Sequence, residues 1–251
     1  MVQGEFSVGS ALGRGIGIWI KNLPSFLILA AIGYAPALIF AATRDPKVLL
    51  EPTMGGRLLE AALNTVGQAV ASAGILYGVI QQLRGNHAGI GESLGVGIKR
   101  LLPVIGVSIV VALAVFAGTL ALLVPGIIIS CMLYVAVPAA VIEKPGLGGA
   151  LKRSQELTSG YKMQIFGLWL IINVVTFVAA YVIAKTMIPE PTTFTGNLES
   201  LLSKYKTMMF VIVALQLVMG SLGAVLNGVV YHDLRAVKEG VATDDLAKVF
   251  E

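Results

Sequence analysis

Residues 101–142 read LLPVIGVSIVVALAVFAGTLALLVPGIIISCMLYVAVPAAVI and contain no Asp, Glu, Lys, Arg or His. A segment of roughly 20 apolar residues crosses a hydrocarbon layer of about 30 Å. The stretch is therefore long enough for two membrane spans, residues 101–124 and 126–142. The dipeptide Pro125-Gly126 is the only connection available between them, so we expect the two spans to form a tight hairpin.

The same apolar character extends over the rest of the chain. Of the 251 residues, 56% are hydrophobic and 13% are charged, whereas a soluble domain carries about 25% charged residues. A soluble fold of this size would leave apolar surface exposed to water and would aggregate. We therefore predict a single all-α integral membrane domain, 1–251, with six transmembrane helices. The predicted spans are residues 23–43, 61–83, 101–124, 126–142, 163–184 and 207–231.

Basic residues give the expected orientation. With the N-terminus in the cytoplasm, twelve of the 18 Lys and Arg residues lie in cytoplasmic segments and six lie outside. Membrane proteins concentrate Lys and Arg in their cytoplasmic segments. We expect both termini in the cytoplasm, with residues 232–251 as a tail that ends in a short helix, 244–250.

Three segments share a short pattern ahead of the odd-numbered spans: residues 5–20, 89–100 and 146–162. The pattern reads Val8-Gly9-Ser10-Ala11-Leu12, Ile90-Gly91-Glu92-Ser93-Leu94 and Leu147-Gly148-Gly149-Ala150-Leu151. Each segment continues through mixed apolar and basic residues, which is typical of a short amphipathic helix at the membrane surface. This predicts a threefold repeat, in which three hairpins surround a pseudo-threefold axis. The alternative is that such basic, amphipathic flanks are simply common in membrane proteins.

Catalytic, metal and cofactor sites are not expected. The two histidines, His87 and His232, are far apart in sequence, and the single Cys131 lies inside an apolar run. No spacing typical of zinc ligands occurs. A net charge of +4 fits basic cytoplasmic loops rather than a nucleic-acid surface. We therefore expect neither an enzyme nor a nucleic-acid-binding protein.

The predicted spans carry neutral polar side chains but no ionisable groups of the kind that mark ion paths. These polar side chains are Asn64, Gln68, Ser130, Asn173, Gln216 and Asn227. Hydrogen bonds between helices are their expected role, with ligand binding as the alternative. Their neutrality argues against an ion-coupled pump and leaves open a passive channel or a lipid pathway.

Small residues recur at four-residue spacing, which allows helices to approach closely in a membrane. The candidate packing residues are Gly74, Gly78, Gly220, Ala224 and Gly228; Gly9, Gly13 and Gly17 form a further set. Packing within one chain is the expected role, and a dimerisation face is the alternative.

Charged residues gather where the even-numbered spans reach the cytoplasm. The candidate collar consists of Arg84, Glu143, Arg153, Asp233 and Arg235. We expect Arg84–Glu143 or Asp233–Arg153 ion pairs that fix the register of the helices. The alternative is a site for anionic lipid headgroups, because basic pockets between helices suit phosphate.

Three segments resemble an uncharacterised bacterial membrane family that includes the multi-helix domain fused to some glycerophosphodiester phosphodiesterases. They are Phe6-Ser7-Val8-Gly9 with Lys21-Asn22-Leu23-Pro24, the stretch Ala150-Leu151-Lys152-Arg153-Ser154-Gln155-Glu156-Leu157-Thr158-Ser159-Gly160, and Tyr231-His232-Asp233-Leu234-Arg235 with Lys238-Glu239-Gly240. His232 stands where the family usually has a second tyrosine. The phosphodiesterase domain, with its metal-binding side chains, has no counterpart here, so the resemblance implies no enzymatic function.

Three functions remain open. The first is a non-enzymatic protein that organises envelope lipids or serves as a membrane platform, with membrane lipids as partners. The second is a transporter or channel for a small or amphipathic solute, which a core without any polar cavity would exclude. The third is an accessory subunit of a larger membrane complex or a homo-oligomer, which exposed small-residue faces would favour.

Overall fold

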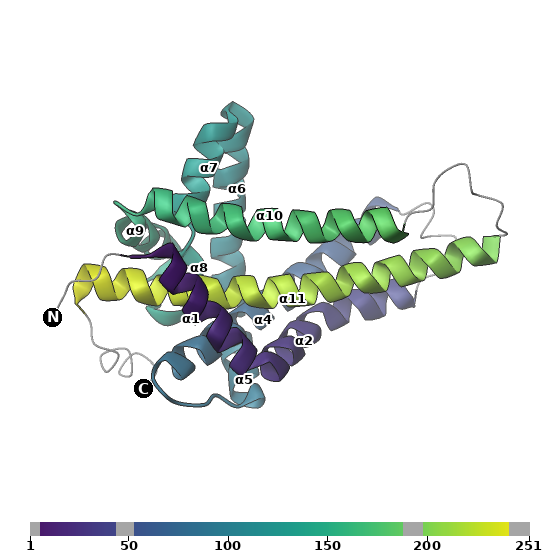
Figure 1. Ribbon diagram of the computed structural model, residues 1–251, viewed down its shortest axis with the longest axis horizontal. Coiled ribbons are helices and arrows are strands. Elements are labelled where there is room, and N and C mark those ends of the chain that lie inside the picture. Colours follow the sequence, from purple (N-terminus) through teal and green to yellow (C-terminus); the bar gives the residue numbers. More distant parts are fainter. Residues whose placement is uncertain (1–5, 44–52, 188–197, 241–251) are drawn as a thin grey trace.

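The computed structural model describes residues 6–43, 53–187 and 198–240, and these residues form only helices and their connections (Figure 1). The helices are α1 (Val8–Lys21), α2 (Leu23–Ala42), α4 (Met54–Leu83), α5 (Ile90–Lys99), α6 (Leu101–Ala121), α7 (Leu123–Met132), α8 (Ala136–Ile142), α9 (Gly146–Thr158), α10 (Lys162–Met187) and α11 (Leu198–Glu239). Six stretches are long and apolar enough to cross a membrane, which confirms the number of predicted spans. They are Leu23–Phe40, Met54–Leu83, Leu101–Ala121, Leu123–Ile142, Lys162–Thr186 and Phe210–Glu239.

Two helices are longer than the sequence predicted. α4 begins at Met54, where the Thr53 hydroxyl accepts a hydrogen bond of 3.2 Å from the Gly56 amide and caps the helix. α11 has 42 residues and is therefore about 63 Å long, twice the thickness of a hydrocarbon layer. The predicted span, 207–231, lies within α11, and residues 232–239, predicted as part of the cytoplasmic tail, continue the same helix. The predicted final helix, 244–250, lies outside the described residues.

The third and fourth spans form the expected hairpin, but its connection differs from the prediction. α6 ends at Ala121 and α7 begins at Leu123, so Leu122 makes the turn. Pro125 lies in the first turn of α7, where its missing N–H leaves no hydrogen bond unmade. A Cβ on Gly126 would lie 2.1 Å from the Thr119 hydroxyl. Glycine is therefore needed at position 126 for the close contact of the two helices rather than for the turn.

The fourth span is broken, which the sequence did not reveal. Between α7 and α8 the chain leaves the helix, and backbone carbonyls in a membrane must find other donors. The Met132 carbonyl accepts hydrogen bonds from the Ser154 hydroxyl at 2.8 Å and the Thr158 hydroxyl at 3.1 Å. The Tyr134 carbonyl accepts one from the Asn227 amide at 2.9 Å. Side chains of α9 and α11 thus satisfy the carbonyls of the break. Asn227 links α11 to this turn, whereas Ser130 and Asn173, also expected to bond between helices, bond to the Gly126 and Trp169 carbonyls of their own helices.

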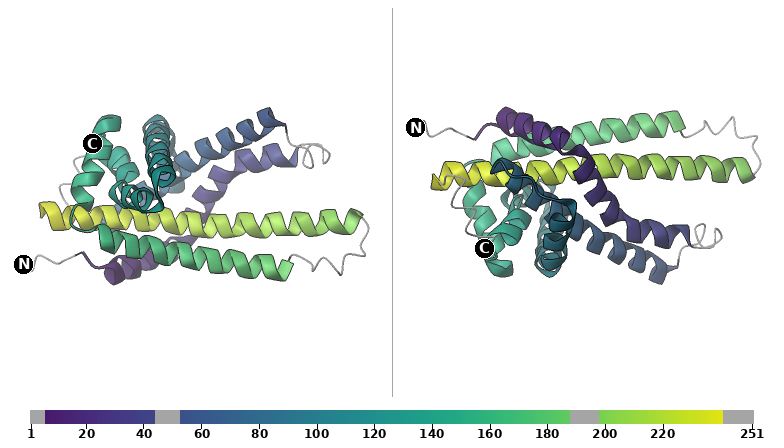
Figure 2. Two further views of the ribbon diagram at one scale, coloured as in Figure 1. Left: turned by 90° about the horizontal axis from the view of Figure 1, so that it is seen from above. Right: turned by 90° about the horizontal axis from the view of Figure 1, so that it is seen from below.

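Three short helices, α1, α5 and α9, each precede a long helix, as the sequence pattern predicted. They pack onto the long helices by close approach. A Cβ on Gly15 of α1 would overlap Leu226 of α11, and one on Gly97 of α5 would lie 2.3 Å from the Val70 carbonyl of α4. Figures 1 and 2 show that the α6–α7 hairpin projects at a steep angle to α10 and α11. The threefold symmetry itself stays a prediction.

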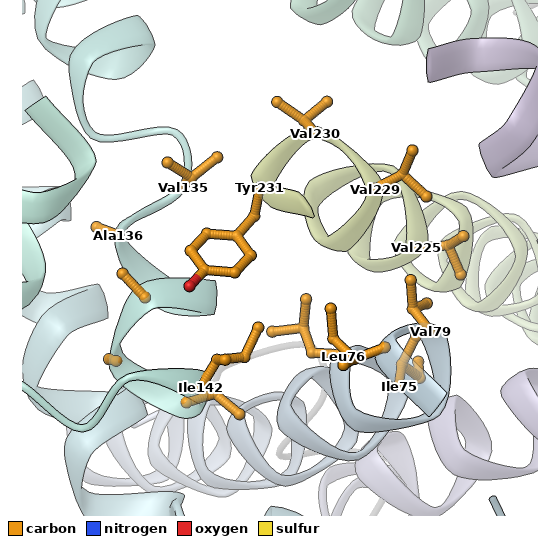
Figure 3. Close-up of a cluster of buried hydrophobic side chains, with 14 of the residues drawn as sticks. Ile75, Leu76, Val79, Val135, Ala136, Ile142, Val225, Val229, Val230 and Tyr231 are labelled. Atoms are coloured by element: carbon orange, nitrogen blue, oxygen red, sulfur yellow. The ribbon is translucent and has the colours of Figure 1, made fainter. Parts of the chain in front are cut away.

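The apolar core lies where α4, α8 and α11 meet (Figure 3). Its labelled side chains are at most 2% exposed: Ile75, Leu76, Val79, Val135, Ala136, Ile142, Val225, Val229, Val230 and Tyr231. A buried aliphatic side chain contributes about 1.5–3 kcal/mol relative to exposure to water. Because a lipid environment removes part of that gain, close packing and the polar groups beside the core carry more of the fold's specificity.

Candidate functional site

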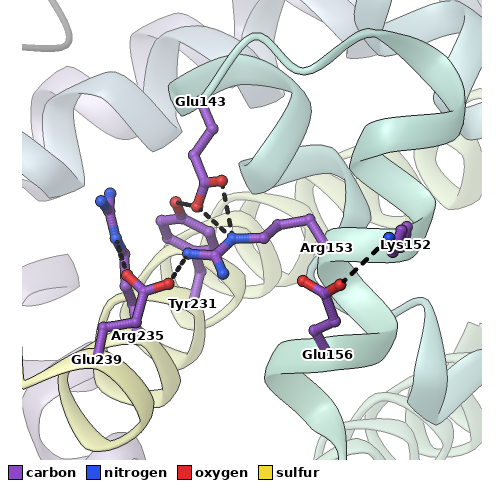
Figure 4. Close-up of polar contacts among 7 residues, drawn as sticks. All are labelled: Glu143, Lys152, Arg153, Glu156, Tyr231, Arg235 and Glu239. Carbon is purple, nitrogen blue, oxygen red and sulfur yellow. Dashed lines mark hydrogen bonds and ion pairs between the residues drawn. The ribbon is translucent and has the colours of Figure 1, made fainter.

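A network of ion pairs joins α8, α9 and α11 at one end of the core (Figure 4). The Arg153 Nε atom donates to both carboxylate oxygens of Glu143, at 2.9 and 2.8 Å. The Arg153 Nη2 atom donates to Glu239. Glu239 also accepts a 2.9 Å hydrogen bond from the Arg235 Nε atom. The Tyr231 hydroxyl donates to Glu143. Positions 231, 235 and 239 lie on one face of α11, so a single helix face supplies three members.

The geometry gives this network a role in holding helices together. Its four charged side chains are 14–27% exposed, so water screens them only in part. Burial acts to lower the pKa of Arg153, but hydrogen bonds with Glu143 and Glu239 outweigh it and raise the pKa. Arg153 therefore stays charged. Because Arg153 bonds to both carboxylates, it is committed to protein partners rather than to a ligand.

Asp233 lies on the opposite face of α11 and pairs with Arg14 of α1. Only 6% of the Asp233 side chain is exposed, and the His232 Nδ1 atom lies 3.4 Å from it. The predicted pairs, Arg84–Glu143 and Asp233–Arg153, were therefore wrong in their partners. Residues two positions apart on a helix point in nearly opposite directions, so α11 divides the predicted collar into two sites. The sequence analysis overlooked Arg14, a cation in the middle of a largely apolar helix, as a partner for Asp233.

Arg84 caps the C-terminal end of α4 and lies near Arg235. Burial lowers the pKa of Arg84, and the positive charge of Arg235 lowers it further. The Nη1 atom of Arg235 is buried and has no hydrogen-bond partner within the described part of the chain. Three of the five predicted collar residues, Glu143, Arg153 and Arg235, thus belong to the Figure 4 network, and Arg84 lies beside it.

Three of the five predicted packing residues act within the chain. A Cβ on Gly74 would lie 2.9 Å from the Ser93 carbonyl of α5, and one on Gly78 would lie 3.0 Å from the Phe26 ring of α2. Gly228 of α11 meets Val79 of α4 in the same way, at 3.1 Å. Gly220 is exposed and Ala224 is half-buried.

The closest backbone approach was not predicted. A Cβ on Gly67 of α4 would lie 1.8 Å from the Gly33 carbonyl of α2. By contrast, Gly9, Gly13 and Gly17 of α1 are exposed, with open space where a Cβ would be. The four-residue spacing in the sequence therefore did not identify the tightest helix contact.

A second feature is a cleft of about 340 Å³ between the beginning of α6, the end of α8 and the beginning of α9. Two cations, Arg100 and Lys144, line it together with an apolar wall of Leu102, Pro103, Val107, Ala140 and Leu147. Neither cation makes an ion pair with another described residue. The sequence analysis counted Arg100 among the basic residues, and Lys144 is next to Glu143 of the predicted collar. It did not predict that the two cations line one cleft, because the turn between α8 and α9 brings Lys144 there.

The turn that positions Lys144 is unusual. Lys144 has a backbone φ of +57°, which a residue with a side chain rarely adopts, and Gly146 follows at +75°. A left-handed residue other than glycine costs about 1–2 kcal/mol. Lys144 thus lines the cleft from a backbone conformation that glycine would adopt without this cost.

Metal ligands do not gather in the part of the chain that the structure describes: no three His, Cys, Asp or Glu side chains lie together there. Comparison with known proteins found no match to any family model, curated protein or solved structure.

Proposed function

We propose that this chain is a non-enzymatic, multi-pass protein of the bacterial inner membrane that binds anionic phospholipid on the cytoplasmic side. The main observation behind the proposal is the cleft that Arg100 and Lys144 line together with apolar side chains. The excess of basic residues in segments taken as cytoplasmic supports the orientation, with both termini inside. The role in envelope organisation follows from lipid binding.

Electrostatics favour an anion in this cleft. α6 begins at Leu101 and α9 begins at Gly146, and neither helix has an acidic residue in its first turn. The N-terminus of a helix carries about half a positive charge and points free N–H groups at a ligand. Two cations and the N-terminus of α9 therefore converge on one cleft, while the C-terminal end of α8 beside them contributes a partial charge of the opposite sign. A phosphate group matches that charge.

The apolar side chains of the cleft favour a lipid over a soluble phosphate compound as its ligand. Leu102 is 81% exposed and Leu147 is 46% exposed beside the cations. Beyond them the outer face of α6 continues with Leu113, Phe116 and Leu120, each more than 60% exposed. An acyl chain along this face would lie next to apolar side chains while its headgroup meets the cations.

Native mass spectrometry tests the proposal. Protein is released from mild detergent with equal amounts of phosphatidylglycerol and phosphatidylcholine of the same acyl length. We expect preferential retention of phosphatidylglycerol, and at least a tenfold loss of that preference in the Arg100→Gln/Lys144→Gly double variant. Glycine suits the left-handed backbone at position 144, so this change removes the charge without adding strain. The matched control is Lys152→Gln, because Lys152 is 80% exposed and does not line the cleft. Equal retention of the two lipids, or an equal effect of the control, would refute the proposal.

A further inference from the structure

A second cleft, of about 440 Å³, lies between α2, α4 and α11, far from the basic one. Figure 2 shows α2 and α4 diverging from α10 and α11. Its lining residues are Tyr34, Ala37, Leu38, Arg57, Glu60, Ala61, Asn64, Ile212, Val213 and Gln216. A smaller pocket shares Tyr34 and continues the cleft inward to Gln68, Ser72 and Ser221. Polar side chains thus run along a seam between three membrane-spanning helices.

Several polar groups in this seam lack a protein partner. The Gln68 Nε2 atom is buried, and although the Tyr34 hydroxyl lies nearby, no hydrogen bond of ordinary geometry satisfies it within the described residues. Asn64 and Gln216 are exposed and form no hydrogen bond with other described residues. An amide exposed to hydrocarbon without a partner costs several kcal/mol. A ligand with donors and acceptors would satisfy these amides.

The lining identifies the chemical class of the ligand. The neutral polar groups that line the cleft are the Tyr34 hydroxyl and the amides of Asn64 and Gln216, which both donate and accept hydrogen bonds. The two ionic side chains, Arg57 and Glu60, have opposite signs. Ala37, Leu38 and Ile212 provide apolar contact beside the polar seam. These features suit a neutral head with several hydroxyl groups joined to an apolar chain.

We propose that the cleft between α2, α4 and α11 binds a neutral, hydroxyl-bearing amphipathic molecule of the glycolipid class. The site is separate from the basic cleft of Arg100 and Lys144, and its ligand carries no phosphate. Binding at two sites of different chemistry would let one chain contact two kinds of lipid. A polar cavity of this kind is also what the transporter alternative requires.

Retention of monoglucosyl diacylglycerol in native mass spectrometry tests the site, with phosphatidylcholine of the same acyl length as the reference. We expect at least a tenfold loss of glucolipid retention in the Asn64→Leu/Gln216→Leu variant. The matched control is Asn173→Leu, because Asn173 is an exposed asparagine on α10 outside the cleft, bonded to the Trp169 carbonyl. The Arg100→Gln/Lys144→Gly variant should keep glucolipid binding, which separates failure of this proposal from failure of the phospholipid site.

Thiol labelling gives a second measurement, which does not depend on the folding of the Asn64→Leu/Gln216→Leu variant. In a Cys131→Ala background, Gln216→Cys should react with a water-soluble maleimide and be protected at least fivefold by the glucolipid. Val178→Cys, at a lipid-facing position that is 52% exposed, should react slowly in both conditions. A glucolipid retained no better than phosphatidylcholine overturns the proposal. So does an unreactive Gln216→Cys, or a dimer that covers the cleft and disperses when Asn64 and Gln216 become leucine.

Discussion

Replacing Arg153 with methionine should loosen the contact of α8, α9 and α11. Methionine retains most of the side chain's apolar length but removes the guanidinium that binds Glu143 at 2.8 Å and also Glu239. A hydrogen bond to a charged group contributes about 1.5–3 kcal/mol, and removing one partner of a buried ion pair costs about 3–5 kcal/mol. Arg153 is 19% exposed at the edge of the fold, where water partly screens both carboxylates. We therefore expect a loss of about 2 kcal/mol in the free energy of unfolding.

The assay is reversible unfolding in mixed micelles with increasing SDS, followed by tryptophan fluorescence. Lys152→Met is the control, because Lys152 is the adjacent residue of α9, is 80% exposed and forms only a 4.0 Å surface pair with Glu156. Surface pairs of this kind contribute little, so the control should unfold like the parent protein.

A double-mutant cycle with Glu143→Gln isolates the ion pair itself. Because the two side chains touch, we expect a coupling energy of about 1 kcal/mol or more. If Arg153→Met and Lys152→Met change the unfolding free energy equally, or if the coupling is zero, the network does not hold the helices together and the reasoning is refuted.

Two further predictions concern contacts that the sequence did not identify. Gly67→Ala should lower the unfolding free energy by about 1–3 kcal/mol in the same SDS titration, because its Cβ would meet the Gly33 carbonyl at 1.8 Å; Gly223→Ala, with open space around it, should be neutral or stabilising. Arg14→Met should lower the melting temperature by leaving the buried Asp233 carboxylate without its cation, and adding Asp233→Asn should restore part of the loss. A Gly67→Ala protein as stable as Gly223→Ala, or no rescue by Asp233→Asn, would contradict these expectations.

Much of the candidate site was visible in the sequence as a list of residues but not as a set of contacts. Arg84, Glu143, Asp233 and Arg235 were singled out because they follow the even-numbered spans, and Arg153 was singled out as an expected partner of Asp233. Their pairing depends on the rotation of α11, which turns Glu239 toward Arg153 of α9 but turns Asp233 toward Arg14 of α1. The spans are apolar on nearly every side, so their sequences do not show which face of α11 packs against α1 and which against α9. The ion pairs could therefore not be predicted.

The sequence alone determined that this chain is helical and has six segments long and apolar enough to cross a membrane, because hydrocarbon requires every backbone group to be bonded within the segment. That constraint is local, and runs of apolar residues display it directly. The tertiary structure alone decided the break at residues 133–135, where donors on α9 and α11 replace helical hydrogen bonds. It also decided the two clefts, since the first joins residues 100–107 to residues 140–147 and the second joins residues 34–38, 57–64 and 212–216. A cleft exists only through the packing angles of those helices, and a linear pattern contains no packing angles.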